Sequence, residues 1–346
     1  MIKTGHGGDI YTRDIEYDFS ANINPLGMPQ SVKTAIVGSI DAYEKYPDVN
    51  CTELKNAIAE LENIDARNIV CGSGAADLIY KIVQVTAPKK ALIIAPTFSE
   101  YEKALRSFGC EIEYFYLEEK NDFELSENIA DRISGMDLMF LCNPNNPVGN
   151  IVNHALLQFI IDKCVANKTV IVVDECFMDF VEDSRKYSVK ADYDNVIILK
   201  AFTKIYAMPG LRLGYLICKD ESLCEKIENI GQCWSVSTVA QTAGAAALAE
   251  KKYIEKTVSY VKKERDFLTA NLKKFGFKVY PSKANFIFFR TDFPIDKMLL
   301  NEKIAVRNCG NYVNLNENFF RIAVRTHKEN EILINTLERI LNNGKG

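Results

Sequence analysis

The sequence has few histidines and no paired cysteine motif. None of its ten cysteines stands in a C-x-x-C pair, so neither a zinc site nor a disulfide framework is expected. Cys71, Cys142 and Cys218 lie inside apolar runs, which predicts small buried thiols in a reducing compartment. The three histidines lie far apart, at His6, His154 and His327.

Long apolar runs, basic runs and phosphate-loop motifs are also missing. No stretch approaches the roughly 18 apolar residues of a membrane span, and the first ten residues have no apolar secretory core. Lys and Arg total 42 against 46 Asp and Glu, a net charge of −4 without a basic run, which argues against nucleic acid as a partner. Neither Gly-Lys-Ser/Thr nor G-x-G-x-x-G occurs, which argues against ATP and dinucleotide loops. These absences predict a cytoplasmic protein without a membrane or nucleic-acid partner.

The sequence does contain a regular alternation of apolar runs and helical patterns. Hydrophobic residues make up 47% and charged residues 25% of the chain, as in an ordinary globular protein of about two domains. Several runs are apolar on both alternating faces, as a parallel sheet covered by helices requires. The order therefore predicts an open α/β sheet. Its seven expected strands are 68–72, 91–95, 111–117, 137–143, 169–175, 195–201 and 213–218, with helices such as 52–61 and 156–165 between them.

The pattern changes towards both ends of the chain. The first forty residues are rich in turns and predict an arm that packs on another part of the molecule. The C-terminal part predicts a smaller α+β domain, with helices over 240–249, 253–275 and 329–341 and strands over 278–281, 285–290 and 320–325. We therefore expect an arm (1–40), a large domain (41–238) and a small C-terminal domain (239–346).

Reactive residue types follow several of the predicted strands. Ligands of open α/β sheets bind beyond the carboxyl ends of the strands. Asn146 follows one strand and Asp174 ends the next, although Asp174 could instead cap a helix. Lys204 follows another strand in apolar company, where a lysine loses its proton readily and forms Schiff bases. Arg212 comes eight residues later.

A turn of small residues at 72–74 opens a predicted helix, and its backbone N–H groups could bind an anion. Such a turn is more often only a turn. Together with the lysine, the carboxylate and the amide, however, it completes the set that pyridoxal phosphate needs.

The order and spacing of these residues resemble the fold-type I pyridoxal-phosphate enzymes, the aspartate aminotransferase superfamily, over essentially the whole chain. Within it the sequence is similar to the branch of histidinol-phosphate aminotransferases and threonine-phosphate decarboxylases. HGGDIY and DFSANINPLG favour the decarboxylases of the cobalamin pathway, because the aminotransferases generally lack both. The resemblance is carried by HGGDIY (6–11), DFSANINPLG (18–27), KYPD (45–48), FLCNPNNPVG (140–149), DECFMDF (174–180), TKIYAMPGLRLGYL (203–216) and RNCGNY (307–312).

The resemblance implies a role for each matching residue. Lys204 corresponds to the Schiff-base lysine, Asp174 to the partner of the pyridinium nitrogen and Asn146 to the donor to the ring oxygen. Tyr46 corresponds to a tyrosine that reaches the neighbouring subunit's cofactor, which implies a homodimer with a shared active site. The cofactor phosphate is expected at Arg212, Thr203, Gly74 and Ala75, with Phe98 stacked on the ring. The implied substrate-binding residues are His6, Gly7, Asn22, Asn146, Arg307 and Arg321, because two arginines suit a substrate with both carboxylate and phosphate; taken alone, each could instead form a surface salt bridge.

The resemblance implies decarboxylation of L-threonine O-3-phosphate, with histidinol-phosphate aminotransferase as the alternative. Phe177 stands where the aminotransferases usually have a tyrosine, which favours the decarboxylase. Two features depart from the pattern: the segment between His6 and Asn22 is short, and Ala201 replaces a hydroxyl that often contacts the phosphate. Serine phosphate is a neighbouring substrate, and a non-catalytic pyridoxal-phosphate-binding protein is disfavoured by the presence of the lysine, carboxylate and arginine together.

Overall fold

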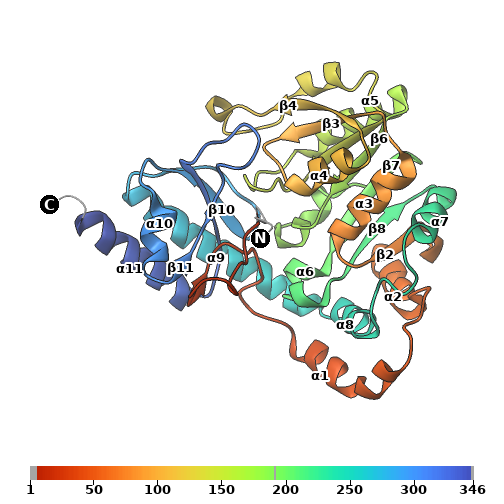
Figure 1. Cartoon of the computed structure of the whole chain (residues 1–346), viewed down its shortest axis with the longest axis horizontal. Coiled ribbons are helices and arrows are strands. Elements are labelled where there is room, and N and C mark those ends of the chain that lie inside the picture. Colours follow the sequence, from red (N-terminus) through yellow and green to blue (C-terminus); the bar gives the residue numbers. More distant parts are fainter. Residues whose placement is uncertain (1–5, 191, 344–346) are drawn as a thin grey trace.

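The computed structural model describes residues 6–190 and 192–343. Its main feature is a seven-stranded sheet with the order β2-β8-β7-β6-β5-β3-β4 (Figure 1). The sheet is mostly parallel, as predicted; only β8 runs antiparallel to its neighbours β7 and β2. All seven predicted strands are present: β2 (Ile69–Gly72), β3 (Lys90–Ala95), β4 (Glu111–Tyr116), β5 (Leu138–Cys142), β6 (Val170–Asp174), β7 (Val196–Ala201) and β8 (Gly214–Cys218).

Both faces of this sheet are covered by helices, which explains why the strands are apolar on both sides. Along β6, for example, Ile171 and Val173 enter one core while Val172 enters the other. One face packs against α3 (Ala75–Thr86), α4 (Ser99–Ser107) and α7 (Glu221–Asn229). The other packs against α2 (Thr52–Glu62), α5 (His154–Asn167), α6 (Phe202–Ile205) and α8 (Thr238–Leu248).

The C-terminal part forms a second, four-stranded antiparallel sheet, as the α+β prediction expected. Its order is β12-β13-β10-β9, and the long helix α9 (Lys251–Lys274) lies beside it. The strands are β9 (Lys278–Val279), β10 (Phe286–Arg290), β12 (Arg307–Asn308) and β13 (Phe319–Ala323), and the other helices are α10 (Ile295–Leu300) and α11 (His327–Asn343). The domain boundaries at 40 and 238 stay a prediction. Within the described residues, no helix is both long and apolar enough to cross a membrane.

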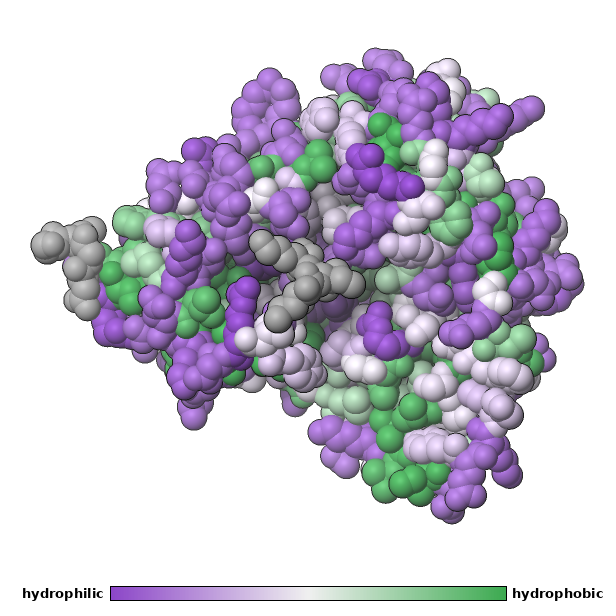
Figure 2. All heavy atoms as spheres, viewed as in Figure 1, coloured by the Kyte–Doolittle hydropathy of each residue, from purple (hydrophilic) through white to green (hydrophobic). Residues whose placement is uncertain are grey.

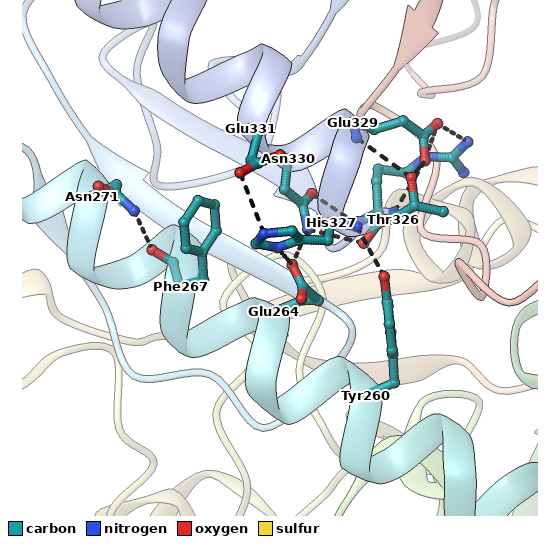
Figure 3. A network of polar contacts seen from close by, with 10 residues as sticks. Tyr260, Glu264, Phe267, Asn271, Thr326, His327, Glu329, Asn330 and Glu331 are labelled. Carbon is teal, nitrogen blue, oxygen red and sulfur yellow. Dashed lines mark hydrogen bonds and ion pairs between the residues drawn. The ribbon is translucent and has the colours of Figure 1, made fainter.

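A buried carboxylate joins α9 to α11. Glu264 is 1% exposed and accepts hydrogen bonds from His327 Nδ1 (3.0 Å) and Asn330 Nδ2 (3.0 Å) (Figure 3). Asn330 in turn accepts from the backbone N–H of Arg325 (3.1 Å). These bonds satisfy a charge that would be costly to bury alone and fix the chain where it leaves β13.

The N-terminal arm is anchored to this second sheet region. β1 (Tyr17–Asp18) pairs in parallel with β11 (Ile304–Ala305), and Phe19 is fully buried. The backbone carbonyl of Phe19 accepts a hydrogen bond from Ala323 N–H (2.8 Å). The arm then continues into α1 (Gln30–Gly38), a helix that the sequence did not predict because it buries only Val32 rather than an apolar stripe.

Candidate active site

A cavity of about 560 Å³ lies at the carboxyl ends of the parallel strands, facing the arm and the second sheet. Its volume is typical of small-molecule sites. The cavity gathers the predicted site residues except Gly74 and Tyr46. Its lining includes His6, Gly7, Ser20, Asn22, Ala75, Phe98, Glu100, Lys103, Asn146, Asp174, Phe177, Ala201, Thr203, Lys204, Arg212, Arg307, Tyr312 and Arg321.

Asp174 is held at the bottom of the cavity by two donors. It is the last residue of β6 and 5% exposed. Oδ1 accepts from the Cys176 backbone N–H (2.9 Å), and Oδ2 accepts from the Tyr101 hydroxyl (2.5 Å). Burial raises the pKa of Asp174, while both hydrogen bonds and the charge of Lys204 act to lower it. The helix-capping alternative is wrong, because the following short helix begins after Phe177 without a side-chain cap.

Lys204 lies on α6, directly after β7. Burial is the largest cause that lowers the pKa of its amine, to about 8, and the positive charges of Arg321 and Arg212 act in the same direction. The negative charge of Asp174 opposes them. A lysine with this pKa has a substantial neutral fraction near neutral pH, and the neutral amine is the nucleophile that attacks a carbonyl.

The Gly-Ser-Gly turn and Arg212 form a cradle for an anion. Gly74 precedes α3 with φ +85°, and a Cβ added to it would lie 2.6 Å from Nη2 of Arg212. The guanidinium therefore packs against the backbone at the start of a twelve-residue helix, whose N–H groups and dipole favour negative charge. Thr203 adds a hydroxyl at 6% exposure. This arrangement fits the phosphate of pyridoxal phosphate, and Lys204 and Asp174 fit its aldehyde and ring nitrogen.

Two arginines on neighbouring strands of the second sheet also line the cavity. Arg307 on β12 and Arg321 on β13 are directly opposite in register, where like charges destabilise a sheet unless an anion lies between or beside them. Arg321 is 5% exposed and donates from Nη1 to Asn146 Oδ1 and from Nη2 to the Ser20 carbonyl (2.9 Å). The salt-bridge alternative is therefore wrong for Arg321. Arg307 Nη2 donates to Asn311 Oδ1 (2.6 Å).

Two buried polar atoms of cavity-lining side chains remain without a hydrogen-bond partner in the described part of the chain. They are Nε of Arg321 and Oδ1 of Asn22, and both side chains line the cavity. Unpaired buried polar groups are costly. Their presence beside a cavity indicates that a polar ligand supplies the missing hydrogen bonds.

Two predicted residues lie outside the cavity lining, which leaves their predicted roles untested, and three further residues lie at or beside the cavity. Gly74 contacts Arg212 without lining the cavity. Tyr46 lies outside the cavity, 79% exposed and stacked on Trp234 with ring centroids 4.5 Å apart. Sequence reasoning missed Tyr101, Glu100 and Lys103, although all three follow the predicted strand 91–95 and Phe98 by a few residues, so the same strand-end argument could have found them.

The whole chain matches known proteins. Residues 14–337 match the model of the aminotransferase class I and II family. The chain is 34% identical to the threonine-phosphate decarboxylase of Salmonella typhimurium, over 99% of this chain and 98% of that protein. It is also 34% identical to an adenosylcobalamin biosynthesis bifunctional protein of Leptospira interrogans, over 93% of this chain and 38% of that protein.

Among solved structures, the histidinol-phosphate aminotransferase of Clostridium acetobutylicum superposes with a TM-score of 0.89 at 31% identity, over 95% of this chain and all of that one. The chain therefore belongs to the aminotransferase class I and II family. It has the fold-type I architecture and is a pyridoxal-phosphate-dependent enzyme.

Proposed function

We propose that this protein decarboxylates L-threonine O-3-phosphate to (R)-1-amino-2-propanol O-2-phosphate and carbon dioxide, in the cytoplasm and as a step of cobalamin biosynthesis. The observation that carries the proposal is the pair of register-opposed arginines, Arg307 and Arg321, which line the same cavity as Lys204. A substrate with both a phosphate and a carboxylate uses two guanidinium groups. The likeness to decarboxylases and to a cobalamin-pathway protein supports the same assignment.

In this proposal the cofactor is held by residues of the parallel sheet and its helices. Lys204 would bind its aldehyde carbon, Asp174 its ring nitrogen and Asn146 its ring oxygen, and Phe98 would stack on the ring. Arg212, Thr203 and the backbone of Gly74 and Ala75 at the start of α3 would hold its phosphate.

The chain's own residues set which bond of the substrate breaks. When bound, pyridoxal phosphate supplies an electron sink for the charge left on the substrate Cα. Arg307 and Arg321, with His6, Gly7, Asn22 and Asn146, fix the substrate carboxylate and phosphate, and this orientation decides between loss of the carboxylate and loss of the Cα proton. Asp174 keeps the ring nitrogen protonated. Lys204, whose pKa is about 8, would give a proton to Cα from its ammonium form and so become the neutral amine.

The proposal includes a homodimer with a shared active site. Large apolar side chains are exposed around α1 and the segment that follows it, including Val37 (71%), Ile40 (63%) and Tyr46 (79%). Figure 2 shows hydrophobic residues gathered over the part of the molecule where Figure 1 places α1. We expect a second copy of this chain to cover this apolar surface. Arg212 is exposed at the edge of the cavity, where Tyr46 of the partner subunit would reach it. Sedimentation of the holoenzyme tests this directly, and a monomer at micromolar concentration would contradict it.

Substrate assays of the holoenzyme test the reaction. We expect release of carbon dioxide from threonine phosphate and slower release from serine phosphate, whose missing methyl changes binding by about 1–3 kcal/mol. The alternative, histidinol-phosphate aminotransferase, is supported by the 31% identity to the Clostridium acetobutylicum enzyme and by similar identities to other enzymes of that name. Transamination of histidinol phosphate without carbon dioxide release from threonine phosphate would reverse the assignment.

A further inference from the structure

Besides Asp174, one more carboxylate lines this cavity, which also gathers positive charge for anionic ligands. Glu100, on α4, faces the same cavity as Lys103, Arg307 and Arg321. A carboxylate beside a phosphate site repels the ligand unless neighbouring cations or hydrogen-bond donors neutralise its charge. Its side chain is 15% exposed and is bonded by three groups from three different elements: His6 of the arm, Tyr80 of α3 and Lys103 of α4.

The contact with His6 determines how that imidazole is protonated. Oε1 of Glu100 lies 2.6 Å from Nε2 of His6 and 2.6 Å from Nζ of Lys103. Burial raises the pKa of Glu100, but hydrogen bonds from Lys103 and His6 outweigh it and keep the pKa below its usual value. Glu100 is therefore ionised at neutral pH and only accepts hydrogen bonds. Nζ of Lys103 also lies 3.2 Å from Nε2 of His6, but the shorter contact, with a carboxylate that only accepts, requires the hydrogen on Nε2. Nδ1 is then the nitrogen left for a ligand.

A neutral His6 in this tautomer would present a lone pair to the ligand through Nδ1, which repels phosphate oxygens. An imidazolium would instead donate from both nitrogens. The charged groups that face His6 are Glu100 and Lys103 from α4 and Arg307 from β12. Burial is the largest influence and, with the charges of Lys103 and Arg307, keeps the pKa of His6 below its usual value, so the free imidazole is mostly neutral near neutral pH. The hydrogen bond to Glu100 opposes this lowering, and a bound phosphate dianion would favour the imidazolium further.

We propose that Glu100 is a positioning and specificity-determining residue: it fixes the tautomer and orientation of His6 and stabilises the imidazolium form that binds the substrate's phosphate dianion. This inference rests on the proposed function for the identity of the substrate. Lys103 keeps Glu100 ionised, and its charge opposes protonation of His6. Glu100 also holds the arm at the cavity, since its Oε1 lies 2.6 Å from Nε2 of His6, and His6 and Gly7 of the arm line the cavity.

The test uses the holoenzyme and two variants with opposite expected signs. Glu100→Gln removes the charge that favours the imidazolium, so the midpoint of the His6 titration falls by about half a pH unit or more. Lys103→Gln removes a neighbouring positive charge, so the midpoint rises. The chain has only three histidines, so the ring signals in a nuclear magnetic resonance titration are assigned by substituting His154 and His327. Glu102→Gln is the matched control, because Glu102 lies on the same helix and pairs with Arg106.

Kinetics with O-phospho-L-threonine complete the test. For Glu100→Gln we expect the KM to rise about threefold or more near pH 8, the factor that a midpoint lowered by half a pH unit gives when the imidazolium binds the phosphate. We expect kcat to stay within about twofold, and the defect in KM to shrink as the pH falls and His6 becomes protonated. Midpoints that stay unchanged, or that move in the same direction in both variants, would overturn the inference, as would a KM defect independent of pH. Opposite shifts of the midpoint in a protein that does not decarboxylate threonine phosphate would retain the role of Glu100 towards His6 and reject the proposed substrate.

Discussion

Two lysines four residues apart, Lys200 and Lys204, differ in what surrounds them. Both are largely enclosed where β7 runs into α6. Burial alone would lower the pKa of each amine. Around Lys200, the charges of Glu175, Asp179 and Glu62 reverse this effect and raise the pKa. Around Lys204, Arg321 and Arg212 add to it, and the pKa falls to about 8.

The comparison shows that the sign of the neighbouring charge separates a structural cation from a reactive amine. Nζ of Lys200 lies 3.0 Å from Glu62 Oε1 and 3.9 Å from Glu175 Oε2, and Lys200 does not line the cavity. Lys204 lies in the cavity between arginines and Asp174. Substitutions at the two positions should therefore affect different properties of the protein.

The largest expected effect is on activity, from Lys204→Ala. Without this amine the cofactor has no covalent attachment and Cα no proton donor, so activity should fall by about 10⁴-fold or more. The visible absorption of the cofactor bound through this lysine should also disappear. Lys200→Met is the control, since it should keep the absorption. Retention of both colour and turnover by Lys204→Ala would contradict the assignment.

The next largest effect is on stability, from Lys200→Met. This change leaves three enclosed carboxylates without their cation, and breaking a buried pair in this way costs about 3–5 kcal/mol. Urea denaturation of the variant, followed by far-ultraviolet circular dichroism, measures the loss in the free energy of unfolding. A loss below about 1 kcal/mol, the range of exposed pairs, would show that the lysine does not neutralise the cluster.

A smaller effect is expected from Tyr101→Phe, which changes the surroundings of Asp174. The hydroxyl of Tyr101 lowers the pKa of Asp174 by donating to Oδ2. Its loss should raise that pKa, weaken the hold on the ring nitrogen and reduce kcat about 10-fold, the scale of one hydrogen bond to a charged group. The pH dependence of the cofactor's absorption reports the change. Tyr114→Phe on β4 is the control, and equal behaviour of the two variants would reject this role for Tyr101.

The sequence predicts the parallel sheet and the strand-end residues well because both have short-range signals. Buried strands are apolar runs, and residues such as Asp174 and Lys204 come directly after them in the sequence. The register of Arg307 against Arg321, by contrast, depends on the pairing of β12 with β13, and the contact of His6 with Glu100 joins residues 94 positions apart. The family resemblance implied the two arginines, whereas the contact of His6 with Glu100 was not predicted. Periodicity carries no information on such long-range contacts.

The carboxylates around Lys200 could not be predicted from the sequence either. The smallest of the expected effects comes from one of them and concerns the pH dependence of stability. Burial raises the pKa of Glu175 from 4.5 to about 7. Between these pH values the folded protein keeps a proton that the unfolded chain has lost, so this group makes the free energy of unfolding fall as the pH rises to about 7. Glu175→Gln removes this contribution, so the stability of the variant relative to the wild type should increase across that window and level off above it. Glu225→Gln, at an exposed position of α7, should instead follow the wild type at every pH. Parallel plots of unfolding free energy against pH for Glu175→Gln and the wild type would show that the Glu175 carboxyl holds no proton near neutral pH. The contrast between Lys200 and Lys204 would then rest only on the distances to their charged neighbours.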